Sequence, residues 1–453
     1  MKLIIFLLIF LFIIFDNTYA VERELTGTGI ILMERSTGRV IYEQNSNMLI
    51  YPASMIKVLT TIVALEHMDM NEIVVVGEEI NHVPFGSSTA GHFIGEHITG
   101  RNLIYGLLLP SGNDTSNVVA AHVAYLVTGN SDMHFEEAEA IFINLMNEKA
   151  RSIGAESSYF TNAHGFHDPR MRVTASDLAL IANYAMNNAI IREVASTISI
   201  ETQSAYGVTG ATRDLNWFNT NRLLTGEFYY PYAIGLKTGF HTPAGHSFIG
   251  VASKDGLEFI TVIGGSTANQ RWIDTTYLFE YAFANYSIET IHIGNNAVSE
   301  FPIKNRRWGD NSYINTYGTT NFSSLFSLEE LARIERELVL FEDPFYIDSD
   351  GHRFLVAPLY AGNMLGEIIY RLDGEVIFTD NIVTRTDIYA WSYISSIQYM
   401  INYVIENPIS IISLSAYLGI IFFLMILIRV ISFIVKLVKR RKKRKKYNSR
   451  FDL

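Results

Sequence analysis

The order of apolar and polar positions between residues 26 and 286 predicts strands on both sides of a helical middle. Residues 26–46, TGTGIILMERSTGRVIYEQNS, alternate apolar and polar positions around a Ser-Thr-Gly turn, which is typical of two paired strands. Apolar residues at helical spacing predict helices at 54–68, 99–109, 114–127, 135–153, 174–187 and 271–286. Strand-type runs fall at 74–76, 233–239, 246–252 and 258–264. This order predicts an α+β fold with an antiparallel sheet.

The pattern changes after residue 285. Residues 286–390 contain short β-type runs with Gly and Asn turns, and Asp373-Gly374 is a hairpin signal, so we expect a small β-rich domain. Residues 391–408 are expected to link it to a transmembrane helix at 409–435, because twenty residues from Ile409 carry no charge. A helix lying on the membrane surface is the alternative, but it would show a polar stripe that this run lacks.

The two ends of the chain predict an exported, membrane-anchored protein. Residues 1–20, MKLIIFLLIFLFIIFDNTYA, have one lysine, a short apolar run and small or polar residues before Ala20, which is typical of a cleaved signal peptide. An uncleaved N-terminal anchor is the alternative. Residues 436–453 form a basic tail that the positive-inside rule places in the cytoplasm. We therefore expect a single C-terminal span with the folded body outside the cell.

Length and charge narrow the class of protein. A chain of 453 residues exceeds what one hydrophobic core usually holds, in agreement with two domains. Residues 429–453 carry a net charge of +10, which leaves −21 on residues 1–428, because the whole chain carries −11. An acidic exported body is unsuited to nucleic acid or anionic lipid. The absence of cysteine excludes disulfides, thiolate nucleophiles and cysteine metal sites.

Three short motifs carry the candidate chemistry. Ser54 and Lys57 lie one helical turn apart in YPASMIKVLTT, so a neutral lysine could take the serine proton; a capping serine with a solvated lysine is the alternative. Ser111-Gly112-Asn113 falls between two predicted helices and is also good capping chemistry. Lys237-Thr238-Gly239 lies on a predicted strand, where lysine and hydroxyl can bind a carboxylate, although an exposed edge lysine is the simpler reading.

Together the motifs are specific, because S-x-x-K, S-D-N and K-T-G in this order form the set of the serine penicillin-recognising enzymes, and here the middle motif reads SGN. The chain resembles the D-alanyl-D-alanine carboxypeptidases among the low-molecular-mass penicillin-binding proteins, serine peptidase family S11. YPASMIKVLTTIVALE, LLLPSGNDTSNVVAAHVA, NAHGFHD and AIGLKTGFHTPAGHSFIGVASKDG carry the resemblance in family order. It implies a serine β-lactamase/DD-peptidase-like catalytic domain at 21–285, and the family's second domain at 286–390.

The resemblance implies a role for each residue. Ser54 would be the acylated nucleophile, Lys57 its base, and Ser111 a proton relay to the leaving amine. Asn113 would bind the substrate amide. On the third motif, Lys237 and Thr238 would hold the terminal carboxylate, and Gly239 would admit the substrate backbone. The backbone N–H groups of Ser54 and Phe240 would form the oxyanion hole, and no metal or cofactor is implied.

The implied activity is removal of the terminal D-Ala from peptidoglycan stem pentapeptides, with β-lactams as covalent inhibitors. Three alternatives stay open: a DD-endopeptidase or a β-lactamase using the same site, and a non-catalytic wall-binding or scaffold protein. A zinc peptidase is disfavoured, because His164 and His167 fall in a glycine-containing loop without a third ligand. NTNRLLTGEFYYPYAIGLKTG has aromatic residues where the family often has polar ones, which bears on substrate choice.

Overall fold

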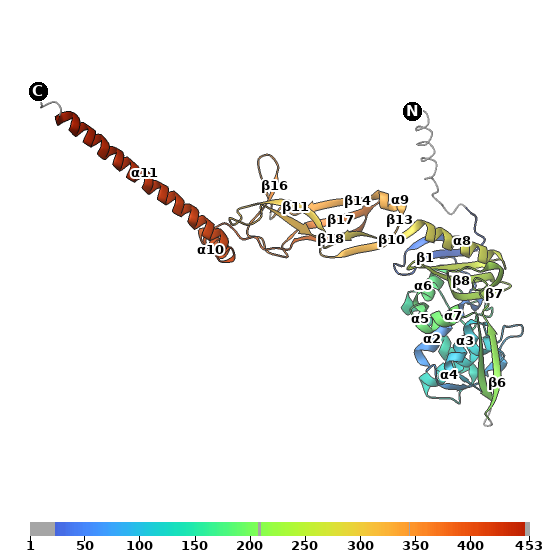
Figure 1. Cartoon of the computed structure of the whole chain (residues 1–453). Coiled ribbons are helices and arrows are strands. Elements are labelled where there is room, and N and C mark those ends of the chain that lie inside the picture. Colours follow the sequence, from blue (N-terminus) through green and yellow to red (C-terminus); the bar gives the residue numbers. More distant parts are fainter. Residues whose placement is uncertain (1–22, 207–209, 344, 449–453) are drawn as a thin grey trace, which may run out of the picture. The chain divides into compact units, whose positions relative to one another are not determined.

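The computed structural model describes residues 23–206, 210–343 and 345–448, so the predicted signal peptide at 1–20 lies outside the described residues (Figure 1). The chain divides into two compact units, which we describe separately. The first comprises the described residues up to Glu289 together with Ser324–Ala332. The second comprises Thr290–Ser323 and the chain from Arg333 onward.

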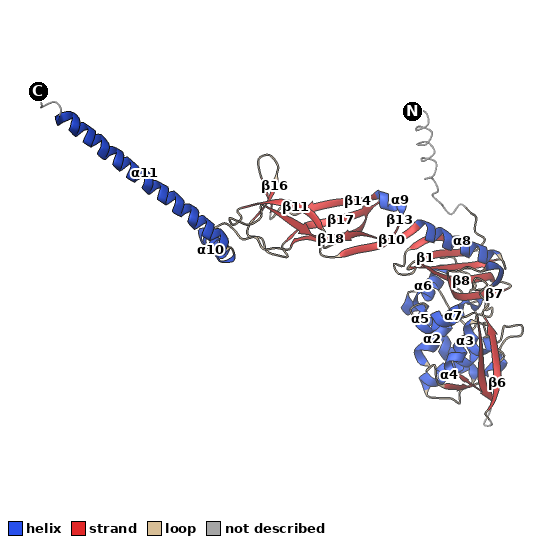
Figure 2. Cartoon of the chain, viewed as in Figure 1, coloured by secondary structure: helices blue, strands red, loops and turns tan. Residues whose placement is uncertain are grey.

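The first unit is built on a five-stranded antiparallel sheet in the order β2-β1-β9-β8-β7 (Figure 2). Its strands are β1 (Gly29–Glu34), β2 (Val40–Gln44), β7 (Ala233–His241), β8 (Gly245–Lys254) and β9 (Leu257–Ser266). Its helices are a short 3-10 helix η1 (Ala53–Ile56), α2 (Lys57–His67), α3 (Gly100–Leu108), α4 (Asn113–Thr128), α5 (Phe135–Ile153), α6 (Ala175–Ala185), α7 (Ala189–Ser196) and α8 (Gln270–Asn285). The predicted α+β fold is confirmed.

Alternate residues of the central strands bury against opposite faces of this sheet, as the period of two requires. Ile30 and Leu32 of β1 join the hydrophobic cluster that contains Trp272 of α8. Ile31 and Met33 join the larger core formed with helices α2 to α7. The sheet is thus covered on both faces, and β7 remains at its edge.

A second sheet of four strands, β3 (Ile73–Val75), β4 (Glu96–Thr99), β5 (Ser199–Tyr206) and β6 (Ala211–Phe218), flanks the helices. The sequence predicted β3 but not β4, β5, β6 or α7. The β5–β6 hairpin buries few side chains, among them Ser204, Leu215 and Trp217. Its apolar alternation is therefore weak, which explains why the pattern did not reveal it.

Residues 324–332 belong to the first unit although they lie far along the chain, within the predicted β-rich domain. Leu325 is fully buried in the cluster that contains Trp272. Glu330, in the short helix α9 (Leu328–Arg333), accepts a hydrogen bond at 3.0 Å from Arg39 Nη1. No local sequence pattern predicts this return, because it depends on packing between distant segments.

The second unit contains a seven-stranded sheet in the order β14-β17-β18-β12-β11-β16-β15. The strands from residue 286 onward are β10 (Tyr286–Ile293), β11 (Ala297–Lys304), β12 (Tyr313–Tyr317), β13 (Asn321–Ser327), β14 (Ile334–Leu340), β15 (Phe345–Ile347), β16 (Arg353–Val356), β17 (Met364–Leu372) and β18 (Glu375–Thr384). Asp373 and Gly374 join β17 to β18 with positive φ angles of 52° and 86°, as the hairpin signal predicted.

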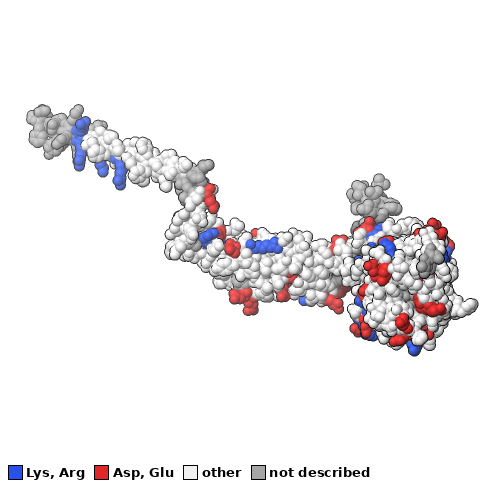
Figure 3. All heavy atoms as spheres, turned by 90° about the horizontal axis from the view of Figure 1, so that it is seen from below, with Lys and Arg blue, Asp and Glu red and all other residues white. Residues whose placement is uncertain are grey.

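Two helices end the described chain, α10 (Tyr393–Glu406) and α11 (Pro408–Asn448). Residues Ser415–Arg441 of α11 are long and apolar enough to cross a membrane. The helix does not stop at the predicted start of the basic tail but continues through it to Asn448. Figure 3 shows the basic side chains near the end of α11, after a long run without charge.

Candidate active site

The turn that carries Ser54 has a strained backbone held by two glycines. Ala53 has a φ of +46°, a conformation that is unfavourable for a residue with a side chain. A Cβ atom on Gly165 would lie 2.0 Å from Ala53 O, and a Cβ on Gly239 would lie 2.8 Å from Pro52 O. Both glycines are therefore required for the backbone to approach this turn. Gly239 thus admits the turn that carries Ser54, and its expected role in admitting the substrate backbone stays a prediction.

Lys57 is fully buried and has three partners. Its Nζ lies 3.0 Å from Ser54 Oγ, 2.7 Å from Asn113 Oδ1 and 2.8 Å from the carbonyl oxygen of His164. The amide and carbonyl oxygens can only accept hydrogen bonds. A neutral amine has two N–H groups, which satisfy these two acceptors, and its lone pair is then left to accept the Ser54 hydroxyl proton. The geometry is that of a general base beside a nucleophile.

Burial favours this neutral form of Lys57. Its pKa lies well below 10.5, first because burial penalises the ammonium ion and second because Lys237 is a like charge; Asp114 opposes both. The pKa of Lys237 is itself lowered to about 7, by burial and then by Arg271. Lys237 therefore contributes to the lowered pKa of Lys57, but burial is the larger cause.

The second motif, Ser111-Gly112-Asn113, contacts the first motif through Asn113, the first residue of α4. Ser111 has a φ of +65°, and its carbonyl oxygen accepts a hydrogen bond from Ser88 Oγ at 2.9 Å. Asn113 N donates to Ser88 O, also at 2.9 Å. Among the described residues, no hydrogen bond joins the Ser111 hydroxyl to Ser54 or Lys57. The structure thus places Asn113, rather than Ser111, in direct contact with the base.

The carboxylate of Asp114 organises the loop beside this motif. It accepts backbone N–H groups from four residues, at 2.8 to 3.1 Å: Ala90, Gly91, His92 and Thr115. The buried His92 ring in turn lies 2.8 Å from Glu96 and 3.0 Å from Thr115. Sequence reasoning missed this network, although a buried Asp at a helix start is a recognisable anchor for backbone donors.

The third motif lies on the edge strand β7, next to the Ser54 turn. Lys237 is 1% exposed, and its Nζ donates to Thr238 O at 3.2 Å. The Thr238 hydroxyl lies 2.7 Å from that of Thr220, a neighbour that the sequence did not reveal. Phe240 is 57% exposed, and its ring stacks on His246 with centroids 4.1 Å apart. The motif therefore offers an ammonium group and two hydroxyls near an open strand edge.

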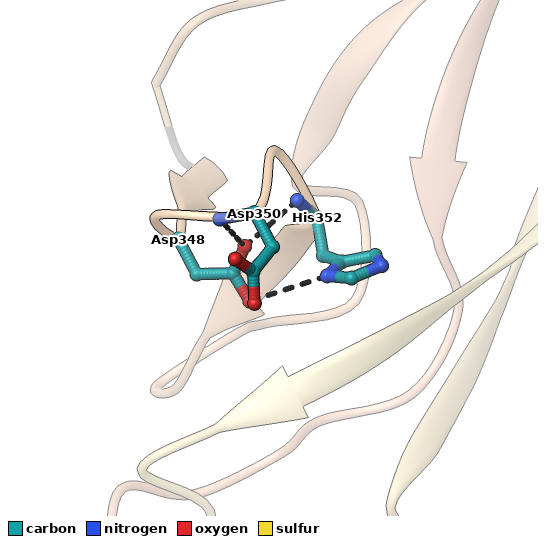
Figure 4. A group of neighbouring side chains, drawn as sticks. All are labelled: Asp348, Asp350 and His352. Atoms are coloured by element: carbon teal, nitrogen blue, oxygen red, sulfur yellow. Dashed lines mark hydrogen bonds and ion pairs between the residues drawn. The ribbon is translucent and has the colours of Figure 1, made fainter.

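The histidines of the HGFH stretch lie in a loop, as predicted. His164 is buried, its Nδ1 accepts the Phe166 N–H at 3.0 Å, and burial with the nearby Lys57 lowers its pKa to about 3. Its contribution to the site is its carbonyl oxygen. Within the described chain, the group that could share a metal ion consists of Asp348, Asp350 and His352 (Figure 4).

This group lies in the β15–β16 turn of the second unit. Asp348 Oδ1 accepts the backbone N–H groups of Asp350 and His352 at 3.0 and 2.9 Å. These are the hydrogen bonds of an Asx-type turn, so the turn itself explains why the side chains gather. We assign the group no part in catalysis.

Known proteins resemble this chain over both units. The family model for D-alanyl-D-alanine carboxypeptidase, Peptidase_S11, matches residues 16–267. The carboxypeptidase DacF of Bacillus subtilis is 25% identical over 364 residues, which are 79% of this chain and 84% of that protein. DacB2 of Mycobacterium tuberculosis is 30% identical over 263 residues, which are 56% of this chain and 81% of that protein.

Solved structures agree with these relatives. The DD-transpeptidase of Streptomyces K15 has a TM-score of 0.54 and 28% identity, and the match covers 58% of this chain and 98% of that one. DacD from Francisella tularensis, at 21% identity, shares the fold with a TM-score of 0.60 over 83% of this chain and 100% of its own. The resemblance drawn from the three motifs is confirmed. Because the family model matches more than half of its residues, the chain belongs to the D-alanyl-D-alanine carboxypeptidases of family S11.

Proposed function

We propose that Ser54 is the acylated nucleophile of this serine D-Ala-D-Ala carboxypeptidase and that Lys57 is its base. The observation that carries the proposal is the buried Nζ at 3.0 Å from Ser54 Oγ, with its two N–H groups occupied by Asn113 and His164. Ser54 Oγ attacks the carbonyl of the penultimate D-Ala as its proton passes to Lys57. The backbone N–H groups of Ser54 and Phe240 stabilise the oxyanion.

The leaving D-Ala amine then needs a proton, and we propose that the proton on Lys57 reaches it through the hydroxyl of Ser111, which is 5% exposed beside Asn113, so that Lys57 is neutral again. Release of D-Ala leaves an ester on Ser54. Lys57 next activates water, and hydrolysis of the ester returns the free enzyme. Since the reaction uses only proton transfer and acyl transfer, it requires no metal or cofactor.

We propose that the KTG strand holds the substrate's C-terminal carboxylate. Lys237 supplies the cation, and the paired hydroxyls of Thr238 and Thr220 supply donors. The Asn113 Oδ1 atom is occupied by Lys57, so its Nδ2 group is the atom left to donate to a substrate carbonyl. The edge position of β7, which includes Gly239, lets an extended peptide pair with the strand.

The substrate class is the peptidoglycan stem peptide ending in D-Ala-D-Ala, and β-lactams occupy the same site. Penicillin binding protein 5 of Haemophilus influenzae is among the structures that share the fold, with a TM-score of 0.57. We further propose that residues 409–435 anchor the protein in the bacterial cell membrane, with the catalytic domain outside and 436–453 in the cytoplasm. The candidate span Ser415–Arg441 and the basic residues at its end support this topology.

One labelling experiment tests the nucleophile. The full chain is incubated with a fluorescent penicillin, and the adduct is located by peptide mapping. We expect it on Ser54, and no adduct there would refute the assignment. Turnover of the penicillin within seconds would identify a β-lactamase instead. With a wall pentapeptide, loss of one alanine by mass identifies the carboxypeptidase, whereas cleavage of cross-linked dimers identifies a DD-endopeptidase.

The β-rich domain at 286–390 is proposed to be a spacer between the catalytic unit and the membrane. A deletion of the whole range would also remove Leu325, which packs in the first unit. A chain that ends after Ala332 keeps this contact. We expect it to hydrolyse a small D-Ala-D-Ala peptide within a few-fold of the full chain, and loss of activity in a folded fragment would contradict the spacer role.

A further inference from the structure

The helix α10 exposes an unusually apolar face immediately before α11. Four isoleucines at helical spacing of three, four and four residues lie on one face and are 52% to 78% exposed: Ile394, Ile397, Ile401 and Ile405. From Trp391 to Ile405 the sequence contains no charged residue. A helix face of this kind is not stable as a water-exposed surface, which points to a partner that removes it from water.

The opposite side of α10 is already held by the β-rich unit. The Tyr399 ring occupies the space beside Gly309, where a Cβ would lie 2.2 Å from it, and the Arg307 guanidinium lies 5.2 Å from its centroid. The backbone N–H of Trp391 donates to the backbone carbonyl oxygen of Asn305 at 2.7 Å, which fixes the chain just before the helix. The isoleucine face therefore remains outward while α10 is attached to its own unit.

Two aromatic residues extend this face onto the β-rich unit. Trp308 is 63% exposed and Trp391 is 48% exposed. They line an open hollow of about 530 Å³ together with Tyr393, Ile397 and Met400 and with three polar residues, Asn305, Arg306 and Ser396. Tryptophan and tyrosine are enriched where a protein surface meets the headgroup region of a bilayer. We call the four isoleucines with Trp308 and Trp391 the interfacial patch.

We propose that the interfacial patch inserts into the outer leaflet of the membrane that α11 crosses, and so fixes the β-rich unit against the lipid surface. The proposal rests on the membrane anchoring proposed above. The candidate span starts at Ser415, nine positions after the end of α10 at Glu406, a separation of about 14 Å at helical rise, so the patch cannot move far from the bilayer. Since α10 has no Lys or Arg and its one charged residue is Glu406 at its end, a lipid interface without anionic headgroups is sufficient.

The native tryptophans provide the test. The chain has four, and the other two, Trp217 and Trp272, are 4% and 0% exposed within the first unit. The full chain is reconstituted into phosphatidylcholine vesicles whose acyl chains carry bromine, which quenches only nearby tryptophan. We expect bromine near the headgroups to quench the tryptophan fluorescence, and most of this quenching to be lost when Trp391→Phe and Trp308→Phe are combined. We also expect the same quenching with phosphatidylglycerol added and at high salt.

A matched pair of variants tests the isoleucine face. Ile394→Gln with Ile397→Gln should reduce quenching of the tryptophans at least two-fold. Ile347→Gln on β15, where the side chain is 55% exposed like that of Ile397, should leave quenching unchanged. Unquenched tryptophans in a chain that floats with the vesicles would overturn this inference alone. A chain that does not float would refute the anchoring and this inference together. Cross-linking between copies through Ile397→Cys, without quenching, would assign the patch to a second copy and overturn the proposal.

Discussion

Replacing Lys237 by methionine should stabilise the first unit while it abolishes substrate binding. The lysine is 1% exposed, and its pKa is lowered from 10.5 to about 7 by burial and by Arg271. In the unfolded chain the same group titrates at its ordinary value. Between pH 7 and pH 10.5 the unfolded state therefore binds more protons, so stability rises with pH across this window and falls as pH is lowered toward 7.

The size of this effect follows from the two pKa values. At pH 7 the buried ammonium group destabilises the native state by about 4 kcal/mol, and at pH 9 by about 2 kcal/mol. The wild type should therefore gain about 2 kcal/mol between these pH values relative to Lys237→Met, in which the group is absent. For a unit of this size the gain corresponds to roughly 4–8 °C in the melting temperature of its transition.

The assay is the melting temperature of the first unit at pH 7 and pH 9, for wild type and variant side by side. Groups that do not interact with Lys237 contribute equally to both chains, so the difference reports Lys237 together with its effect on the pKa of Lys57. Lys254→Met, at the partly exposed end of β8, is the matched control and should show no such pH-dependent difference. A difference between wild type and Lys237→Met that does not change from pH 7 to pH 9 would refute the reasoning.

Three further predictions follow from the site. Because Lys57 must be neutral to act as the base, the rate of penicillin acylation should fall as pH is lowered through its depressed pKa. Lys237→Met should move this fall to higher pH in a stopped-flow profile. Lys57→Met should lower the acylation rate by roughly 10²- to 10⁴-fold. Asp114→Asn presents an N–H₂ group to backbone donors, so the free energy of unfolding measured in urea should fall by about 1–3 kcal/mol. An unchanged urea midpoint would show that the Asp114 hydrogen bonds do not stabilise the unit. Gly239→Ala should keep the fold by circular dichroism but lose penicillin labelling, because its Cβ would lie 2.8 Å from Pro52 O; normal labelling would contradict this.

The sequence indicates which residues come together at the candidate site better than it indicates their contacts. Ser54 and Lys57 are three positions apart in one helical stretch, so local geometry alone sets their approach, and the 3.0 Å contact follows from it. The third partner of the lysine is a main-chain carbonyl at His164. A carbonyl is common to every residue, so no residue type in the sequence could signal it. Thr220 was missed for a related reason, since a lone threonine in a loop has no distinguishing pattern.

In the fold too, elements that depend on local sequence were predicted better than elements that depend on contacts between distant segments. Helix α5 has its predicted bounds, Phe135–Ile153, because its apolar spacing is regular and Gly154 ends it with a φ of +96°. The hairpin of β5 and β6 was missed because most of its side chains stay exposed. The return of Leu325 to the first unit was missed because only a completed core reveals the space that it fills.

Burial, rather than its like-charged neighbour, is the larger cause of the lowered pKa of Lys57, because three protein groups surround its amine and exclude water. Asn113 Oδ1 and the His164 carbonyl accept two N–H groups, so a neutral amine is fully hydrogen-bonded when it also accepts the Ser54 proton. An ammonium ion in the same place would need a third acceptor, and the Ser54 hydroxyl would have to turn its proton toward His164 O, 3.4 Å away. The Ser54 oxygen then becomes that acceptor, so the three partners can satisfy either form, and the exclusion of water is what disfavours the ammonium ion. Burial therefore favours the neutral amine even where Lys237 is itself uncharged, and a change that admits water at His164 should lower the rate of acylation, as a change of Lys57 does.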